Sequence, residues 1–457
     1  MKKPPGPRGR DVLGFFGRGS SLRTLGFLRQ TAREYGPISY FRLFHQHTYL
    51  IDDADLVKEV LVNQQHRFGR DIGATVLREL VGDGLITREE PLHKERRRVL
   101  QPAFHKDQIA SFVDLIAGEC SKTFPRWQDG VAINVGDKLR RLTLSIIGAS
   151  LFGPEFRGNA EAISAVLGRV MKRARGVAPL VTFLKPLTRA YRRVLPNGPS
   201  LFFQSERTEL DRILQPLIER KQNTGGRDVL SLLLALYENE SRSLTDSDIR
   251  NEIVTFVLAG HETTATALTW ACYLLARRPE IQEKLAAEAV SVLSDRPPTL
   301  EDLPQLPYAS MVFNETLRLF PPVPFFGRRA VEPVDLAGYT IPPGATVLLS
   351  PYITQRNQRY FDDPESFVPD RWQTAGHPKF AFFPFGGGAK ICIGEPFART
   401  EGTLILAEIM RRFELAPDSP GEVGMNPRVT LAPATPVIVI PQLRSHVFCR
   451  DESVTSV

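Results

Sequence analysis

The stretch Phe383–Gly394, FPFGGGAKICIG, places three consecutive glycines, a lysine and a cysteine shortly after a proline. Glycine lowers the steric cost of a tight turn and lets the backbone approach another group closely. Cys392, held in such a turn, could be a metal ligand, a nucleophile or a buried apolar side chain. The remaining sequence has to distinguish these three roles.

The chain of 457 residues has an ordinary soluble composition, with 42% hydrophobic and 24% charged residues. Its net charge is +7, but the basic residues are spread widely and no nucleic-acid motif is evident. We therefore expect no nucleic-acid partner, and a basic surface that suits an acidic protein or is simply solvated. No apolar run of about 18 residues occurs, which predicts a soluble, cytoplasmic monomer without a transmembrane anchor.

The cysteines do not form a metal-binding or disulfide pattern. The chain has four, Cys120, Cys272, Cys392 and Cys449, and none belongs to a C-x-x-C pair. Their wide spacing argues against structural zinc and against a disulfide framework, and favours a reducing compartment. Cys120 and Cys272 fall in helical patterns, so we expect both to be buried apolar side chains.

The strand signals flank a long helical region. Ile38–Ile51 mixes β-branched and aromatic residues and predicts a hairpin. Helical patterns dominate from Asp107 to Leu319, and strand signals return in Val334–Ser350 and Val429–Pro441. Because strands and helices do not alternate, a doubly wound sheet is disfavoured. We predict one domain, 1–457, that is mainly α-helical with small β-sheets contributed from both ends of the chain.

The longest predicted helix runs from Thr245 to Arg278. Thr245 and Asp248 resemble a capping box, and Pro279 ends the helix or opens the next one. A helix of this length extends about 50 Å, enough to cross the whole molecule.

The middle of this helix, AGHETT at Ala259–Thr264, interrupts the apolar pattern. Gly260 costs about 1 kcal/mol relative to alanine in a helix interior. Phe256, Gly260 and Thr263 share one face. One interpretation is a close helix crossing at Gly260, with threonines bonded to the backbone. The other is an acid–hydroxyl pair beside a helix flaw, lining a polar pocket above a flat cofactor.

Four motifs then follow one another in a fixed order. They are AGHETT, ETLR at Glu315–Arg318, FVPDRW at Phe367–Trp372 and FGGGAKICIG at Phe385–Gly394. Their order and spacing resemble the cytochrome P-450 family of haem-thiolate monooxygenases, and the resemblance covers nearly the whole chain. It implies the cytochrome P-450 fold, with a long central helix over haem b.

The resemblance assigns Cys392 as the axial thiolate ligand of the haem iron. The glycine-rich turn would let backbone N–H groups point at the sulfur and tune its electron donation. Phe385 matches the aromatic residue that packs beside the thiolate. Lys390 stands where arginine is usual, as a haem propionate contact; lysine supplies a point charge without the bidentate fork.

Further propionate contacts are implied in two other segments. LHKERRRVLQPAF, Leu92–Phe104, resembles a helix that carries two of them, His93 and its i+4 partner Arg97. PFFGRRAVE aligns Arg328 with a third contact, and Arg329 is the competing choice.

The ETLR motif implies a structural role. Glu315 and Arg318 lie one helical turn apart and can pair, and the resemblance adds Arg371 as a third member. This triad would fix the loop that presents Cys392. The alternative is a surface ion pair worth a few tenths of a kcal/mol.

The implied substrate site is apolar. GDGLIT, Gly82–Thr87, resembles the loop over the distal haem face, where Ile86 would touch substrate, with Phe256 and Ala259 facing it from the central helix. Pro179–Gln204 would form a mobile lid. These features suggest a hydrophobic small molecule, a fatty acid or a terpenoid.

The implied reaction inserts one oxygen atom of O₂ into the substrate and releases the other as water. Thr263 would hydrogen-bond the reacting oxygen, and Glu262 would relay protons through ordered water. No dinucleotide or flavin fingerprint is present, so electrons would come from a ferredoxin or flavodoxin with its reductase. The basic run Lys94–Arg98 could dock such a carrier.

Two other functions share this fold class. Peroxygenases and isomerases need no reductase, but they usually disrupt the acid–threonine pair, which is present here as Glu262–Thr263. A non-catalytic haem sensor needs no proton relay and usually carries a signalling domain, which the sequence lacks.

Overall fold

The structure is a computed structural model of the chain. It describes residues 2–9, 12, 21–43, 46–104, 106–153, 156, 159, 161–170, 173, 202–224, 228–231, 234, 245–374, 376–427 and 430–444. The predicted lid, Pro179–Gln204, lies outside the described residues except for 202–204, and so does Cys449.

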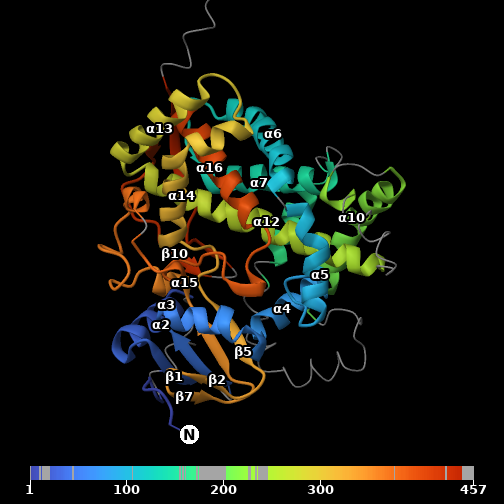
Figure 1. Cartoon of the computed structure of the whole chain (residues 1–457). Helices are drawn as coiled ribbons and strands as arrows, with labels where there is room; N and C mark the ends of the chain where they lie inside the picture. The colour runs from blue at the N-terminus through green and yellow to red at the C-terminus, as the bar shows by residue number, and fades with distance from the viewer. Residues whose placement is uncertain are drawn as a thin grey trace, which may run out of the picture.

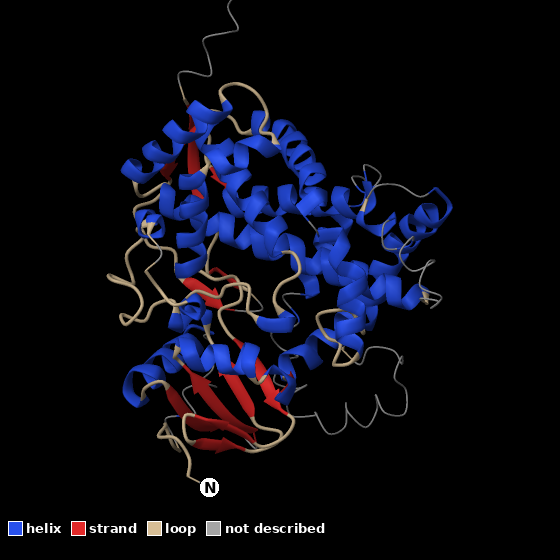
Figure 2. Cartoon of the chain, in the orientation of Figure 1, coloured by secondary structure: helices blue, strands red, loops and turns tan. Residues whose placement is uncertain are grey.

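A helical body forms most of the molecule, as predicted (Figures 1 and 2). Its α-helices are α2 (Ser21–Tyr35), α3 (Ala54–Lys58), α4 (Ile72–Val81), α5 (Leu92–Leu100), α6 (Lys106–Thr123), α7 (Val135–Phe152), α10 (Gln204–Thr224), α12 (Asp246–Leu275), α13 (Pro279–Leu293), α14 (Pro307–Leu319), α15 (Pro351–Thr354) and α16 (Glu395–Arg412). Short 3₁₀ or π segments are η2 (Glu59–Asn63), η3 (Gln65–Arg67), η4 (Gln101–Phe104), η5 (Phe124–Arg126), η7 (Leu300–Gln305), η8 (Pro369–Gln373), η9 (Lys379–Ala381) and η10 (Gly388–Lys390).

Small sheets come from both ends of the chain, which confirms the predicted fold class. The largest, at the lower end of Figure 2, has the order β1-β2-β8-β5-β3. Its strands are β1 (Ile38–Leu43), β2 (Gln46–Ile51), β3 (Phe68–Arg70), β5 (Phe326–Ala330) and β8 (Thr346–Leu349). The smaller sheets pair β4 (Ile133–Asn134) and β9 (Phe413–Pro417) with β12 (Ile438–Leu443), β6 (Val334–Leu336) with β7 (Tyr339–Ile341), and β10 (Met425–Pro427) with β11 (Leu431–Pro433).

The predicted hairpin is present as β1 and β2. The strands are antiparallel, with Ile38 opposite Ile51 and Leu43 opposite Gln46. β2 then pairs in parallel with β8, so segments about 300 residues apart share one sheet. This pairing joins the N-terminal hairpin to a strand that follows the helical region in sequence.

Helix α12 crosses the middle of the molecule (Figure 1). Thr245 caps it through a complete capping box with Asp248, as the sequence predicts. The helix ends at Leu275, three residues before the predicted Arg278, and Pro279 occupies the first turn of α13. Most of α12 is buried around its whole circumference, which fits its central place.

Tight packing fixes α12 against α7. A Cβ atom at Gly260 would lie 2.9 Å from Ile147 Cδ1, closer than such contacts allow. Thr143 on α7 donates a hydrogen bond of 3.0 Å to the His261 carbonyl. A side chain at position 260 would have to displace Ile147, so the close crossing of α7 and α12 favours glycine here and positions the AGHETT segment against α7.

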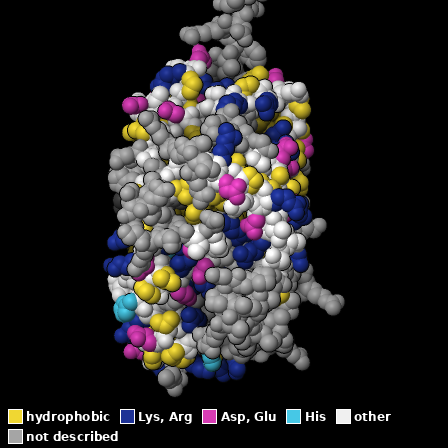
Figure 3. Space-filling view, turned by 90° about the vertical axis from the view of Figure 1, so that its right-hand side faces the viewer, with side chains coloured by type: hydrophobic (Ala, Val, Ile, Leu, Met, Phe, Trp, Pro, Cys, Tyr) yellow, Lys and Arg dark blue, Asp and Glu magenta, His cyan; other side chains and the backbone are white. Residues whose placement is uncertain are grey.

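The structure also bears on the predicted absence of a membrane-spanning helix, on the basic surface and on the burial of two cysteines. No helix among the described residues is long and apolar enough to span a membrane. Figure 3 shows Lys and Arg side chains interspersed with Asp and Glu on the described part of one face. Cys120 and Cys272 are both fully buried, as predicted.

Candidate functional site

The turn that carries Cys392 needs its glycines for two separate reasons. Gly386 and Gly388 have φ angles of +76° and +68°, a region that side chains rarely adopt. A Cβ atom at Gly388 would also lie 1.7 Å from the Leu61 carbonyl oxygen of η2. The turn therefore packs directly on η2, and the Cys392 amide closes it by donating to the Phe385 carbonyl at 3.0 Å.

The Cys392 thiol is accessible, whereas Cys120 and Cys272 are not. Burial by the surrounding protein nevertheless raises the pKa of Cys392 to about 11. The backbone amides of Gly394 and Glu395 donate toward the sulfur and oppose this rise in pKa. These donors, together with Arg97, fit a thiolate that is held by a metal cation.

A cluster of cations lies beside this turn. Lys390, His93 and Arg328 all have lowered pKa values, with burial the largest cause and the charge of Arg70 the next. The pKa of His93 falls to about 4, so this imidazole is neutral near pH 7, and the pKa of Arg328 falls to about 10. The cations of the cluster are therefore Lys390, Arg328 and Arg70. Mutual repulsion between buried cations is unfavourable unless an anion lies among them.

Arg70 belongs to this cluster, although the sequence analysis did not identify it. It stands directly opposite Arg328 in the antiparallel register of β3 and β5. Like charges in this position destabilise a sheet. The juxtaposition depends on strand pairing across more than 250 residues, so no local pattern in FGRD could have indicated it.

The carboxylates near the cluster offset only part of its charge. Glu90 Oε1 lies 3.0 Å from His93 Nδ1 and 3.9 Å from Lys390 Nζ. Glu89 accepts from the Arg70 amide and lies 3.6 Å from Arg329 Nη2. The cluster therefore retains a net positive charge that suits a dianionic group.

Arg328 and Arg329 point to different surroundings. Arg328 is 9% exposed and is influenced by the cation cluster. Arg329 pairs with Glu89 and donates to the Arg70 carbonyl at 3.3 Å. Of the two alternatives left open by the sequence, Arg328 is the side chain that the structure places within the cluster.

Arg97 links the cation cluster to the cysteine turn. Its Nη1 donates to the Ile391 carbonyl at 2.6 Å, one residue before Cys392. Phe385 is partly buried on the same turn and stacks under the Arg399 guanidinium at 4.8 Å. Haem has two propionates and an iron that takes a thiolate, so the accessible thiol and the cation cluster together fit this cofactor.

The AGHETT segment is a continuous helix with back-bonded threonines. Thr263 Oγ1 donates to the Ala259 carbonyl at 2.7 Å, and Thr264 Oγ1 to the Gly260 carbonyl at 3.3 Å. The expected flaw is therefore not a break in the described helix, because α12 runs unbroken through it. Ala259 is exposed and Leu258 partly exposed, although residues 251–257 before them are buried, so α12 becomes accessible at this point.

Glu262 lies beside Thr263 in a poorly solvated position. Burial raises its pKa, and the charge of Arg140 on α7 partly opposes this rise. His261 Nε2 lies 3.9 Å from Glu262 Oε2, while His261 Nδ1 is 2.7 Å from the Val257 carbonyl oxygen. Burial lowers the pKa of His261 to about 4, which keeps this imidazole neutral near pH 7.

The three side chains expected to touch substrate differ in exposure. Ala259 is exposed, and Ile86 is partly buried against the main core. Phe256 is 6% exposed, and its ring centroid lies 5.2 Å from that of Phe104. Phe256 therefore packs mainly within the protein, and Ala259 is the most accessible of the three.

The triad predicted around ETLR is brought together in the interior. Arg318 and Glu315 are both 0% exposed and are joined by two hydrogen bonds of 2.8 and 2.9 Å. Arg371 Nε binds Glu315 Oε1 at 3.0 Å. Trp372 and the Val368 amide donate to the same carboxylate, each at 2.9 Å. The sequence analysis missed these two additional donors.

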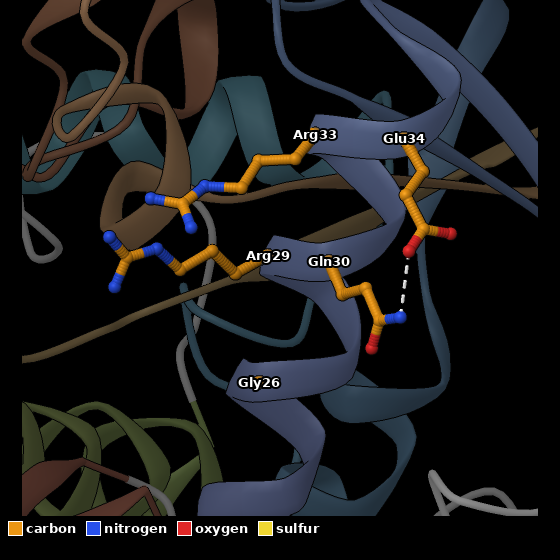
Figure 4. A pocket seen from close by; sticks show the side chains of 5 residues that line it. All are labelled: Gly26, Arg29, Gln30, Arg33 and Glu34. Carbon is orange, nitrogen blue, oxygen red and sulfur yellow. Dashed lines mark hydrogen bonds between the residues drawn. The ribbon is translucent and has the colours of Figure 1, made fainter.

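A shallow recess on α2 is a separate feature (Figure 4). It is lined by Gly26, Arg29, Gln30, Arg33 and Glu34. Gln30 donates to Glu34 at 2.7 Å, and Arg29 pairs with Glu365. None of these residues belongs to the cysteine turn, the cation cluster or the AGHETT segment, so this recess is not the functional site.

Comparisons with known proteins agree with this geometry. The family profile "Cytochrome P450" matches residues 4–440. Cyclooctatin synthase of Streptomyces melanosporofaciens is 34% identical over 423 residues, which cover 90% of this chain and 89% of the relative. Pentalenene oxygenase of Streptomyces avermitilis is 31% identical over 395 residues (85% and 86%), and cyclooctat-9-en-7-ol 5-monooxygenase of S. melanosporofaciens is 32% identical over 394 residues (84% and 83%). The chain belongs to the cytochrome P-450 family of haem-dependent monooxygenases.

Proposed function

We propose that this monooxygenase oxidises a neutral, apolar terpenoid. The names of two relatives, pentalenene oxygenase and cyclooctat-9-en-7-ol 5-monooxygenase, state terpenoid substrates. The observation that carries the proposal is the pairing of charged side chains around the distal loop. Arg88 and Arg96 both bind Asp248, and Arg70 donates to the Leu85 carbonyl. These three arginines around the distal loop are thus engaged by protein groups, which favours a neutral ligand over the carboxylate of a fatty acid.

The cofactor would be held by the residues of the cysteine turn and the cation cluster. Cys392 would ligate the iron, and Lys390, His93, Arg97 and Arg328 would surround the propionates. When bound, haem supplies the activation of O₂ that amino-acid side chains cannot provide. The protein would orient the substrate, exclude water and deliver protons.

Proton delivery would depend on Thr263 and Glu262. Because Thr263 Oγ1 already donates to the Ala259 carbonyl, its lone pairs can accept a hydrogen bond from a proton-bearing group. The raised pKa of Glu262 lets this carboxyl hold a proton more readily than an exposed glutamate. The acid–hydroxyl pair also favours O₂-dependent turnover over the peroxygenase and isomerase alternatives.

Electrons would come from separate proteins, a ferredoxin or flavodoxin and its reductase. The exposed Lys94 on α5 lies three residues before Arg97, which contacts the cysteine turn. A basic surface at this place suits an acidic electron carrier. Comparing turnover supported by reductant and O₂ with turnover supported by peroxide alone separates the monooxygenase from a peroxygenase or a sensor.

The substrate proposal is tested by titrating the holoenzyme with two matched sets of ligands. One set contains cyclic terpene hydrocarbons and their monoalcohols, and the other contains fatty acids of similar carbon number. Displacement of the water ligand of the iron shifts the Soret band, so each titration gives an affinity. We expect the terpenes to bind at least about tenfold more tightly, which corresponds to about 1.4 kcal/mol. Tighter binding of the fatty acids would overturn the proposal.

A further inference from the structure

The distal loop Gly82–Thr87 lies flat against the first half of α12. Gly82 has a φ angle of +71°, and a Cβ atom there would lie 2.3 Å from Asn251 Oδ1. A Cβ atom at Gly84 would lie 2.4 Å from Thr255 Oγ1. The loop backbone therefore approaches α12 more closely than side chains on the loop would allow.

Glu252 fastens this loop from the α12 side. Its Oε2 accepts a hydrogen bond of 2.9 Å from the Leu85 amide, and the residue is only 2% exposed. Arg96 Nε of α5 lies 3.5 Å from its other oxygen. One turn earlier, Asp248 binds both Arg96 and Arg88. Two carboxylates on one face of α12 thus hold the loop and α5 together.

Arg70 binds Leu85 from the side opposite to Glu252. Its Nη2 donates to the Leu85 carbonyl at 3.1 Å. The amide and the carbonyl of Leu85 are therefore bound by two charged side chains, Glu252 from α12 and Arg70 from β3. Ile86 follows immediately, so its backbone position is determined by this two-sided clamp.

We propose that Glu252 is a positioning residue that, with Arg70, fixes the Leu85 backbone and thereby sets where Ile86 stands at the substrate site. The inference rests on the proposed function in one respect, namely that Ile86 borders the substrate. It does not depend on the substrate being a terpenoid. Without the carboxylate, the buried Leu85 amide loses its acceptor, and the loop loses its bond to α12. The substrate site would then change in shape while the cysteine turn remains intact.

The clamp is tested with two ligands of different size, imidazole and 4-phenylimidazole, which bind the haem iron from the distal side. The variants are Glu252→Ala, Glu252→Gln and Ile86→Ala, each as holoenzyme. Glutamine keeps an oxygen that can accept from the Leu85 amide. Glu401→Ala is the matched control, because it removes another buried carboxyl that lies on α16 rather than beside the loop.

We expect Glu252→Ala to change the affinity for 4-phenylimidazole by about fivefold or more while imidazole changes less than about twofold. Ile86→Ala should share this dependence on ligand size. The affinities of Glu252→Gln for both ligands should stay near those of the wild type. The CO spectrum of thiolate-ligated haem should be unchanged in all variants. Wild-type affinities in Glu252→Ala, equal losses for both ligands, or no size effect in Ile86→Ala would each overturn the proposal.

A second variant covers the case in which Glu252→Ala yields no holoenzyme. Gly84→Ala keeps Glu252 but places a Cβ atom against Thr255, which displaces the loop. The same size-dependent change is then expected, and wild-type affinities would overturn the proposal. If fatty acids bound more tightly than terpenes while Glu252→Ala still affected 4-phenylimidazole more than imidazole, only the terpenoid substrate would be rejected. The positioning role of Glu252 would stand.

Discussion

The two sides of the site hold their buried carboxylates differently. Glu315, in the network that we expect to support the Cys392 turn, is 0% exposed and accepts N–H donors from Arg318, Arg371, Trp372 and the Val368 backbone. Glu252, beside the distal loop, accepts one hydrogen bond, from the Leu85 amide. Among the described residues its Oε1 has no hydrogen-bond partner.

The difference shows how the number of donors determines what burial costs. Burial raises the pKa of Glu252 to about 7, against the opposing effects of the Leu85 amide and Arg96. A carboxylate without enough donors is expensive to bury. On the side of the Cys392 turn, a fully hydrogen-bonded carboxylate therefore stands in the network that we expect to support this turn. On the side of the distal loop, Glu252 supplies one hydrogen bond to Leu85, and Arg70 supplies the other.

The largest effect is expected from breaking the saturated network with Arg318→Ala. Glu315 would remain as an uncompensated buried charge, and three backbone carbonyls, those of Gln355, Pro364 and Ser366, would lose their donor. Loss of one member of a buried pair costs about 3–5 kcal/mol. We expect mostly haem-free, poorly folded protein, measured as the haem-to-protein ratio and the melting temperature.

Lys122→Ala is the control for this variant. Lys122 pairs with Glu119 at the same i,i+3 spacing, but its side chain is 48% exposed. Its partner Glu119 is only 8% exposed, but Glu119 also accepts a hydrogen bond of 2.6 Å from Ser145, so it keeps a donor when the solvated Lys122 is removed. We therefore expect Lys122→Ala to cost about 0–1 kcal/mol. If Arg318→Ala retained as much haem as Lys122→Ala, the network around Glu315 would have no special structural role.

The next effect concerns the distal side, where Thr263→Ala should impair chemistry without impairing folding. Its hydroxyl bonds only the neighbouring Ala259 carbonyl in the described contacts, so its loss leaves the packing of α12 nearly intact. General acid–base assistance contributes typically about 10²–10⁴-fold. We expect at least about tenfold less product per reductant oxidised, with hydrogen peroxide released instead.

Thr264→Ala and Thr263→Ser sharpen this test. Thr264 is the next residue, is back-bonded in the same way and is buried, so its removal should leave coupling unchanged. Thr263→Ser keeps the hydroxyl and should recover much of the coupling. Equal coupling in wild type and Thr263→Ala would remove Thr263 from proton delivery and reopen the peroxygenase alternative.

Local sequence signals sufficed for the fold and for much of the site. The capping box at Thr245, the hairpin of β1 and β2 and the turn around Cys392 all depend on residues close in sequence. Arg70 depends on the register between β3 and β5, which no local pattern encodes. The same reason explains why Glu252 went unnoticed, because its partner Leu85 lies 167 residues away.

A smaller effect should separate Arg328 from Arg329. Arg328 lies opposite Arg70 in the cation cluster, whereas Arg329 pairs with Glu89. A hydrogen bond to a charged group contributes about 1.5–3 kcal/mol. Arg328→Leu should therefore raise the rate of haem transfer to apomyoglobin by about tenfold or more. Arg329→Leu, the matched control, should change this rate less than about twofold, and the reverse order would exchange the two assignments.

A last effect, spread over several pH units, extends the comparison to a third buried carboxyl, Glu401 on α16, for which the described residues provide no hydrogen-bond donor. It is 0% exposed, and neither of its oxygens has a hydrogen-bond partner among the described residues. The nearby Thr264 lowers the pKa of Glu401, but its hydroxyl proton is already donated to the Gly260 carbonyl. Burial consequently raises the pKa of Glu401 from 4.5 to about 8. The comparison thus predicts that this group is protonated in the native state at pH 7.

The raised pKa makes native stability depend on pH with a definite sign. Between pH 4.5 and about 8 the native state holds a proton on Glu401 that the unfolded state has lost. The free energy of unfolding therefore falls as pH rises through this window, by up to about 1.4 kcal/mol per pH unit, and becomes independent of this group above it.

Glu401→Gln removes the titration, so its melting temperature should equal that of the wild type near pH 5 and exceed it increasingly toward pH 8. The exposed Glu414→Gln is the control and should follow the wild type throughout. If the difference in melting temperature between Glu401→Gln and wild type were constant from pH 5 to pH 8, Glu401 would have to stay ionised in the native state. The relation between the number of hydrogen-bond donors and the cost of burial, drawn from Glu315 and Glu252, would then not hold for Glu401.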